Sequence, residues 1–212
     1  MLFKDRRDAG RQLVPKLEKY KGHKDVIVMG LARGGMVTAA EVAEGLDVPL
    51  NVVVVRKIGA PGNEELAVGA IAEHGEGIFN ENLIDVLGVS REYLKREVER
   101  QREILKDRLE LYRGKSPAPE LKGKIVILVD DGIATGASIR VAIKSMREAK
   151  VKKIVLAVPV AAPDSLHKIS QEVDETVCLY SPAFFEAVGE FYREFDQTSD
   201  DEVIRLLTPK SN

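Results

Sequence analysis

Five short stretches of the chain are almost entirely apolar and rich in β-branched residues, and helical patterns separate them. The apolar stretches cover residues 25–30, 50–55, 125–129, 153–160 and 176–180. Such runs are typical of strands buried on both faces of a parallel sheet. Between them, apolar residues recur every three or four positions, as in amphipathic helices. This alternation predicts an α/β fold: a Rossmann-like parallel sheet flanked by helices.

Two further helices are expected outside this alternating pattern. Residues 4–20 read as a surface helix with Arg6 and Arg7 near its start. Basic residues there oppose the helix dipole, which would suit a ligand contact, but solvated surface arginines are the preferred interpretation of that pair. Ser90 is placed as the N-cap of a long helix over residues 91–112, which carries charges of both signs beside one apolar stripe. Mixed charge argues against RNA binding, so we expect this helix to pack against its own domain or a second subunit.

Length and composition favour a single domain spanning residues 1–212. Two appendages are expected within it, a flexible loop and hairpin at about 57–80 and a C-terminal aromatic segment at 181–207. The 32 basic and 34 acidic residues give a net charge of −2, which indicates neither nucleic acid nor a membrane as an obligatory partner. With one cysteine, no long apolar run and no signal-peptide pattern at the start, the expected compartment is the cytoplasm.

The most informative stretch begins where the third apolar strand ends. Asp130 and Asp131 follow Val129 directly, and a loop of small residues leads into the next helix; the loop includes Ala134, Thr135, Gly136, Ala137 and Ser138. Backbone N–H groups at a helix N-terminus bind phosphate, and small residues allow the anion to approach closely. Carboxylates beside a phosphate suit sugar hydroxyls or hydrated Mg²⁺. The predicted ligand is a sugar phosphate.

A second strand–loop–helix unit lies earlier in the chain. The first apolar strand runs into Leu31, followed by Ala32, Arg33, Gly34 and Gly35. A guanidinium and backbone amides converge there at a helix N-terminus, which suits a diphosphate. Alone, this Gly-Gly entry to a helix is weak evidence. It gains weight from the later motif, because the carboxyl ends of parallel strands share one edge of the sheet.

The run VILVDDGIATGAS at residues 126–138 resembles the phosphoribosyl diphosphate (PRPP) motif of type I phosphoribosyltransferases. The resemblance implies that Asp130 and Asp131 hold the ribose hydroxyls and that residues 134–138 bind the 5′-phosphate. It also implies that Ala32, Arg33, Gly34 and Gly35 bind pyrophosphate, in a loop that often has a non-proline cis peptide in this family. Lys57 is expected at the base of a mobile loop that closes over the diphosphate. Mg²⁺ is the implied cofactor, held through PRPP oxygens and water, with Asp130 or Asp131 as further candidate ligands.

The implied reaction transfers a phosphoribosyl group from PRPP to a nitrogen nucleophile, a nucleobase or related heterocycle, and releases pyrophosphate. Some purine-using members have a carboxylate where this chain has Ala134, so hypoxanthine and guanine are less expected acceptors. Adenine-specific members tolerate alanine there. The family's hood, which holds the base, varies too widely for any acceptor contact to be transferred to the aromatic segment. A homo-oligomer, a dimer, is expected.

Two other functions remain open from the sequence. The first is a PRPP-sensing regulator that retains the fold without turnover; Arg33 and Lys57 beside the motif favour turnover over sensing. The second is a phosphate-ester hydrolase or isomerase on a similar sheet, which should offer a nucleophile with a partnered base. The sequence shows no such pair.

Overall fold

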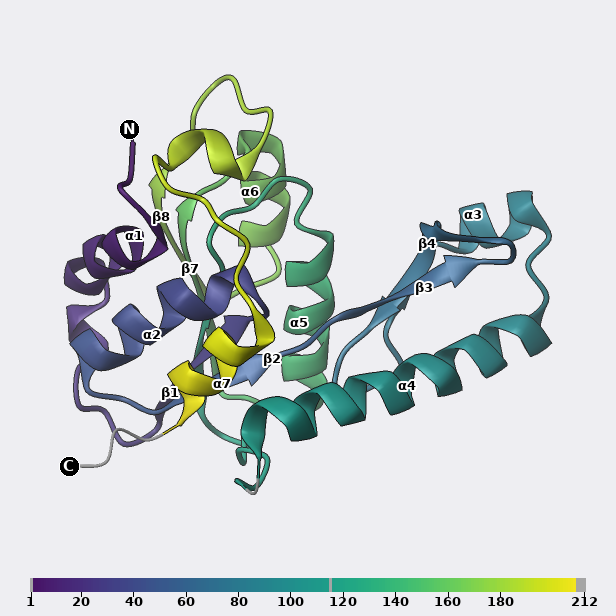
Figure 1. Cartoon of the computed structure of the whole chain (residues 1–212), viewed down its shortest axis with the longest axis horizontal. Coiled ribbons are helices and arrows are strands. Elements are labelled where there is room, and N and C mark those ends of the chain that lie inside the picture. Colours follow the sequence, from purple (N-terminus) through teal and green to yellow (C-terminus); the bar gives the residue numbers. More distant parts are fainter. Residues whose placement is uncertain (1, 115, 209–212) are drawn as a thin grey trace.

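The centre of the computed structural model, which describes residues 2–114 and 116–208, is a five-stranded parallel sheet (Figure 1). Its strand order is β2-β1-β6-β7-β8. The strands are β1 (Val26–Leu31), β2 (Leu50–Val53), β6 (Ile125–Val129), β7 (Lys153–Val160) and β8 (Glu175–Tyr180). All five predicted strands are present and parallel, so the predicted α/β fold is confirmed.

Helices cover both faces of this sheet. α1 (Arg6–Leu13) and α2 (Gly34–Leu46) lie on one face, and α5 (Ala137–Glu148) and α6 (Pro163–Ser170) lie on the other. Alternate side chains of each strand enter alternate cores: Val28 packs with Val42 of α2, and Met29 packs with Ile143 of α5. The continuous apolar strands are explained by this two-sided burial.

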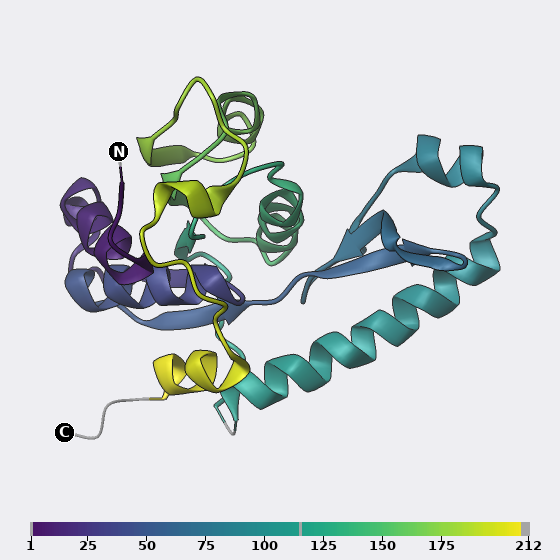
Figure 2. The same ribbon diagram turned by 45° about the horizontal axis from the view of Figure 1, so that its top comes forward.

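Residues 56–113 form an arm that extends away from the sheet (Figures 1 and 2). The arm contains β3 (Arg56–Ala60), β4 (Asn63–Ile71), β5 (Ile78–Phe79), α3 (Glu81–Leu87) and α4 (Arg91–Arg113). The three strands form an antiparallel sheet that packs on α4 around Ile58, Val68 and Leu105. The arm therefore has an apolar core of its own, which continues into the main domain through Met36 and Val52.

The arm differs from the sequence expectation in three places. Residues 58–63, expected as a loop, form most of β3, a turn at Pro61–Gly62 and the start of β4. The second difference is helix α3, which was not predicted, and the third is in α4. By contrast, the predicted pairing of residues 66–72 with 77–80 is confirmed, because Gly69 pairs with Phe79. In α4, which begins after Ser90 as predicted, the apolar stripe is interrupted by buried Gln101, whose side chain accepts a hydrogen bond from Arg56 at 2.9 Å.

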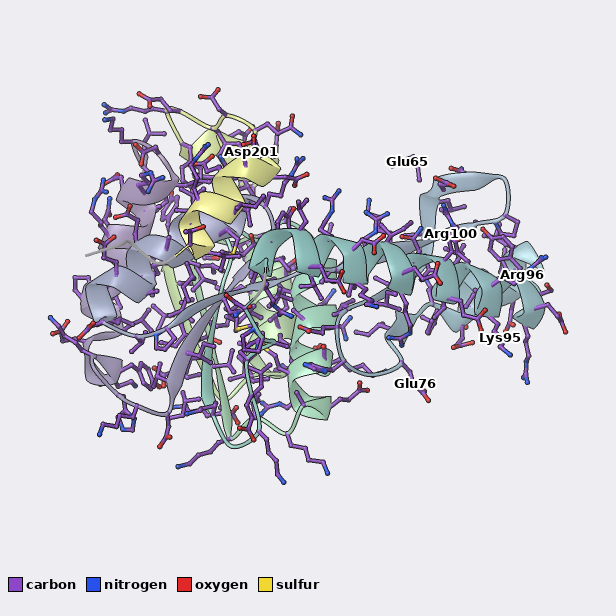
Figure 3. The ribbon with its side chains drawn as sticks, turned by 60° about the horizontal axis from the view of Figure 1, so that its bottom comes forward. Glu65, Glu76, Lys95, Arg96, Arg100 and Asp201 are labelled. Atoms are coloured by element: carbon purple, nitrogen blue, oxygen red, sulfur yellow. The ribbon has the colours of Figure 1, made fainter. Side chains whose placement is uncertain are left out.

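The outer surface of the arm is charged with both signs. Figure 3 labels Lys95, Arg96 and Arg100 on α4, and Glu65 and Glu76 on or beside β4. α4 itself packs on β3, β4 and α7 (Asp200–Leu207). This agrees with the expectation that the long helix packs within its own domain.

The base of the arm is fastened to the main domain. Arg113, whose side chain is only 6% exposed, donates to Asn51 Oδ1 of β2 at 3.0 Å and to the Val52 carbonyl at 3.4 Å. A bidentate ion pair with Glu73, with N–O distances of 2.6 and 2.7 Å, holds the guanidinium in place from within the arm. The turn after β4 contacts α5, because Ser145 accepts a hydrogen bond from the His74 amide at 3.0 Å and Lys144 donates to the Gly77 carbonyl. The hairpin is thus attached to the helix that begins with Ala137.

The N-terminal residues pack against the C-terminal aromatic segment on the sheet domain. Phe3 pairs with Tyr192, and the two rings pack at a centroid distance of 5.3 Å. Phe185 and Phe191 extend this satellite core, whereas Phe184 is 92% exposed. The aromatic residues lie in irregular chain and the short 3-10 helix Val188–Phe191, not in a long helix. The expected N-terminal helix is also shorter, because it ends at Leu13 and gives way to two 3-10 turns over residues 14–20.

In the described residues, 2–114 and 116–208, every helix is too short or too polar to cross a membrane.

Glu175, at the start of β8, should stabilise the fold in a pH-dependent way. Partial burial alone would raise the pKa of Glu175, but hydrogen bonds from Lys153, Lys19 and Tyr20 outweigh it and lower the pKa to about 2. A carboxylate with a lowered folded pKa stabilises the protein above its unfolded pKa, and that contribution disappears as pH falls from about 4.5 towards about 2. We expect Glu175→Gln to lower the free energy of unfolding by about 1–2 kcal/mol at pH 7.

Urea unfolding of both proteins at pH 7 and pH 3 measures this effect, and the difference should shrink at pH 3. Glu18→Gln is the matched control, because Glu18 pairs with Lys21 on an exposed surface and should change stability little. A difference between wild type and Glu175→Gln that is the same at both pH values would contradict the prediction.

Candidate active site

The connections after β1 and β6 lie side by side at the carboxyl edge of the sheet. β1 and β6 are neighbours, and Gly30 pairs with Val129 in the last position of their register. The loops at residues 32–35 and 130–138 therefore start next to each other. Open parallel sheets bind ligands at this edge, so the structure brings the two predicted loops together at a ligand-binding position.

The two loops touch through their glycines and carboxylates. A β-carbon at Gly34 would lie 2.1 Å from Asp131 Oδ2, and one at Gly35 would lie 2.7 Å from Asp130 Oδ1 and 2.9 Å from Asp130 Cα. These distances are well inside normal van der Waals contact. Only glycine permits so close an approach, and the acidic pair and the predicted pyrophosphate loop consequently form one site.

Asp130 is held in an environment that disfavours its charge. Burial, followed by the negative charge of Asp131, raises the pKa of Asp130 well above its usual range. Asp130 Oδ1 accepts a hydrogen bond from the Asp131 amide at 2.9 Å, which offsets part of this effect. Carboxyl groups whose pKa is shifted by burial and by a neighbouring charge are frequent at functional sites.

Asp131 has two partners that the sequence interpretation did not place in the site. Arg6 Nε lies 2.6 Å from Asp131 Oδ2, and the Tyr192 hydroxyl donates a hydrogen bond to the Asp131 carbonyl at 2.5 Å. Burial, and then the charge of Asp131, raises the pKa of Tyr192, so its hydroxyl remains a donor. The sequence held one hint of Arg6, since a basic residue at the start of a helix opposes the helix dipole. No feature of the sequence indicated that Tyr192 would contact Asp131.

The predicted 5′-phosphate loop presents an open helix N-terminus. Ala134, Thr135, Ala137 and Ser138 are exposed. α5 starts at Ala137 with no side chain capping from its N-cap residue and no acidic residue in its first turn. The Ala137 amide makes only a long hydrogen bond to the Thr135 hydroxyl, at 3.5 Å, so an anion can bind at this helix start. Gly136 has φ of 74°, and a β-carbon there would lie 2.3 Å from Ile169 Cδ1, which leaves glycine as the fitting residue.

Arg33 stands at the start of α2, in the predicted pyrophosphate loop. The Ala32–Arg33 peptide bond is cis, as the resemblance implied. The guanidinium points towards α7, where Arg33 Nη1 lies 3.8 Å from Asp200 Oδ1. Arg108 of α4 lies 3.7 Å from the same oxygen, and the Tyr112 hydroxyl donates to it at 2.5 Å. Asp200 is thus shared between two guanidiniums, and its contact with Arg33 is the longer of the two.

Lys57 is exposed on β3 and lines a cavity of about 570 Å³ under the hairpin. Ala137 and Ser138 line the same cavity, whereas residues 32–35 are not among its walls. The structure thus brings Lys57 to the start of α5 and does not place it against the predicted pyrophosphate loop. A pyrophosphate contact by Lys57 stays a prediction.

Asp130 and Asp131 are the acidic side chains available to a cation at this edge. In the described residues, no group of three or more His, Cys, Asp or Glu side chains is placed to hold a metal. Mg²⁺ usually keeps several waters and binds through one or two carboxylates together with substrate phosphates. Two adjacent carboxyl groups beside an open helix N-terminus fit that requirement.

Comparison with known proteins identifies a family whose matched region includes both loops of the site. Residues 4–195 match the family described as the phosphoribosyl transferase domain. A Mycobacterium tuberculosis protein, provisionally named a phosphoribosyl transferase, is 45% identical over 211 residues, covering 97% of this chain and 46% of that protein. The chain spans about half the length of this curated relative. Uracil phosphoribosyltransferase of Aquifex aeolicus is 37% identical over 60 residues, 28% of this chain and 29% of that enzyme.

A solved structure matches the whole fold. The crystal structure of the protein TT1426 from Thermus thermophilus has a TM-score of 0.82 and 42% sequence identity, and the match covers 98% of both chains. The sheet, the arm and the C-terminal segment of this chain therefore recur together in another protein.

Proposed function

The chain belongs to the phosphoribosyl transferase domain family, and from this premise we propose that it transfers the phosphoribosyl group of PRPP to a nitrogen nucleophile with release of pyrophosphate. The resemblance identified from the PRPP motif is confirmed at the level of the family. The observation that carries the proposal is the contact of Gly34 and Gly35 with Asp131 and Asp130. Because of this contact, the carboxylate pair, the loop at residues 32–35 with Arg33, and the N-terminus of α5 lie at one edge of the sheet.

The proposed reaction exchanges one bond at the anomeric carbon for another. The bond from C1′ to the diphosphate oxygen breaks, and its electron pair leaves with pyrophosphate. The acceptor nitrogen forms a new bond to C1′ and loses its proton to solvent or to the leaving group. The transition state resembles a ribosyl oxocarbenium ion, so positioned charge contributes more than a protein nucleophile would.

Each part of the site has a proposed task in this reaction. Asp130 and Asp131 hold the ribose hydroxyls, and the negative charge that they carry when ionised stabilises the developing cation. The amides and hydroxyls of residues 134–138 bind the 5′-phosphate. Arg33, with the amides of Ala32, Gly34 and Gly35, stabilises the leaving diphosphate. The exposed Lys57 adds a positive charge from the hairpin side, and closure of the hairpin would exclude water.

Mg²⁺ is the proposed cofactor. When bound, it neutralises diphosphate charge. The proposed ligands are PRPP oxygens and water, with Asp130 or Asp131 as additional donors.

The proposed acceptor is a nucleobase or related heterocycle. Ala134 offers no carboxylate to assist a purine ring nitrogen, so hypoxanthine and guanine are the less favoured acceptors. Uracil is the first choice for testing, because the Aquifex aeolicus enzyme that shares 37% identity over 60 residues carries that name. Adenine is the second choice.

The test is incubation of the protein with PRPP, Mg²⁺ and, separately, uracil, adenine, guanine, hypoxanthine and orotate. Mass spectrometry should detect one nucleotide whose mass is that of the base plus a phosphoribosyl group, together with an equal amount of pyrophosphate. Reactions without PRPP are the control. Binding of PRPP without any nucleotide would instead favour the sensing protein, and no PRPP binding would contradict both functions.

A homodimer is part of the proposal. It is supported by apolar side chains left exposed on the arm, where Val86 of α3 is 82% exposed and Leu87 is 42% exposed. A second copy that covered them would remove this apolar surface from water.

A further inference from the structure

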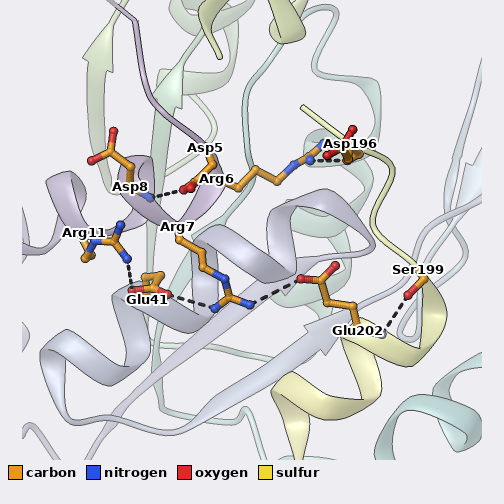
Figure 4. Close-up of polar contacts among 9 residues, drawn as sticks. All are labelled: Asp5, Arg6, Arg7, Asp8, Arg11, Glu41, Asp196, Ser199 and Glu202. Atoms are coloured by element: carbon orange, nitrogen blue, oxygen red, sulfur yellow. Dashed lines mark hydrogen bonds and ion pairs between the residues drawn. The ribbon is translucent and has the colours of Figure 1, made fainter. Parts of the chain in front are cut away.

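Arg6 and Arg7 are neighbours on α1 whose side chains have different surroundings (Figure 4). Arg6 is 12% exposed and reaches Asp131, with 2.6 Å between Nε and Oδ2. Arg7 is 44% exposed and lies between Glu41 and Glu202 at 3.1 and 3.5 Å. The sequence interpretation treated both as solvated surface residues, and for Arg6 the structure shows otherwise.

The Arg6 guanidinium is fixed on three sides. Its Nε faces Asp131, its Nη1 donates to the Asp196 carbonyl at 2.7 Å, and its Cζ lies 3.8 Å above the Phe195 ring. A planar guanidinium held by stacking and directed hydrogen bonds has little freedom to rotate. Whatever Arg6 holds is therefore held in one orientation.

The support for Arg6 comes from the residues before α1 and from the C-terminal aromatic segment. Phe3 accepts a hydrogen bond from the Arg193 amide at 2.9 Å, and Lys4 accepts one from the Glu194 amide at 3.0 Å. These bonds join the residues before α1 to the segment that carries Phe195 and Asp196. The same segment contributes Tyr192, which donates to the Asp131 carbonyl. These two paired segments thus hold Asp131 by its side chain and by its backbone.

We propose that Arg6 is a positioning residue that orients the Asp131 carboxylate towards the ribose of the bound substrate. Because Arg6 fixes Oδ2, it also fixes the direction of Oδ1. Without a cation beside it, Asp131 would have the Asp130 carboxyl as its nearest charged neighbour, and repulsion would turn the two groups apart. This inference rests on the proposed function, since it assumes that Asp131 binds ribose.

Arg6→Gln tests the inference, with Arg7→Gln as the matched control. Calorimetry should measure binding of three ligands in the presence of Mg²⁺: PRPP, ribose 5-phosphate and pyrophosphate. We expect Arg6→Gln to weaken the binding of PRPP and of ribose 5-phosphate by similar factors, on the order of 10- to 100-fold. A shift of about 1 Å in a group that positions the substrate can have an effect of that size. Pyrophosphate has no ribose, so its affinity for Arg6→Gln should differ less than about threefold from its affinity for wild type. Arg7→Gln should bind all three ligands with nearly the wild-type affinity.

Arg6→Lys separates charge from geometry and serves as the second variant if Arg6→Gln folds poorly. Lysine keeps the positive charge but cannot face Asp131, Asp196 and Phe195 at once, so it should recover ribose 5-phosphate affinity only in part. Full recovery would show that charge alone is needed and would overturn the positioning role. Two other results would overturn the positioning role. One is an equal loss of affinity for pyrophosphate and for ribose 5-phosphate in Arg6→Gln, and the other is ligand affinities of Arg6→Gln that equal those of Arg7→Gln.

The two proposals fail in different ways. If wild type binds PRPP and Arg6→Gln binds it equally well, the role of Arg6 is wrong and the proposed function stands. If wild type binds neither PRPP nor ribose 5-phosphate, the proposed function is wrong, and the role of Arg6 is overturned with it.

Discussion

Replacing Asp130 and Asp131 together by asparagine is expected to reduce phosphoribosyl transfer by at least about 1000-fold, because the proposed mechanism places both carboxylates against the positive charge of the transition state. The amides would keep hydrogen-bonding capacity but not the charge. Steady-state release of pyrophosphate from PRPP, with the acceptor identified by the base panel, measures the effect. Activity that survives the double substitution would contradict the assigned ribose contacts.

The same substitution should leave the fold intact, because an asparagine amide oxygen at position 131 can still accept from Arg6 and the backbone hydrogen bond from Tyr192 is unchanged. The pKa of Asp130 is raised in the folded protein, so ionised Asp130 makes folding less favourable at neutral pH. Asp130→Asn alone should therefore raise the melting temperature slightly. Asp164→Asn is the matched control for the loss of one acidic side chain, because Asp164 is exposed in the first turn of α6, in the connection that follows β7. It should alter neither turnover nor stability.

Replacing Arg33 by glutamine is expected to lower kcat/KM for PRPP by about 100- to 1000-fold, the usual cost of removing one preorganised donor that faces developing negative charge. Arg33 is the one cationic side chain within the loop at residues 32–35. In this structure its nearest acidic partner is Asp200 at 3.8 Å, a weak contact that a diphosphate can replace. Pyrophosphate affinity, measured by calorimetry, should fall along with kcat/KM.

Arg108→Gln is a closely matched control for Arg33→Gln. Both side chains are 35% exposed, and both have a guanidinium nitrogen within 3.8 Å of Asp200 Oδ1. Burial and the hydrogen bond to Asp200 raise the pKa of Tyr112 to about 12, so Tyr112 continues to hold Asp200 in either variant. Only Arg33 lies in the loop, so Arg108→Gln should change kcat/KM less than about threefold. Equal losses in the two variants would argue against the role of Arg33.

Much of the fold could be predicted from local patterns. Strands such as Ile125–Val129 are continuous apolar runs because helices cover both faces of the sheet, and that pattern is visible without tertiary information. The two loops could be located as well, because parallel topology brings the ends of neighbouring strands together. The approach of Gly34 to Asp131 follows from that topology and from the absence of a side chain.

The parts that could not be predicted depend on contacts between distant residues. Arg6 and Asp131 are 125 positions apart, and nothing in the sequence near either one indicates the other. Gln101 interrupts the apolar stripe of α4 because it bonds Arg56 of β3, so a polar residue occupies a buried position. Residues 58–63 contain glycine, proline and asparagine and therefore read as a loop, but they form a hairpin because α4 supplies an apolar surface for Ile58.

The crystal structure of this protein with PRPP and Mg²⁺ is the most direct test of the central claim. It should show the 5′-phosphate within hydrogen-bonding distance of the amides of residues 135–138 and the ribose hydroxyls on Asp130 and Asp131. A phosphate bound elsewhere, or a ribose that does not contact either carboxylate, would contradict the account.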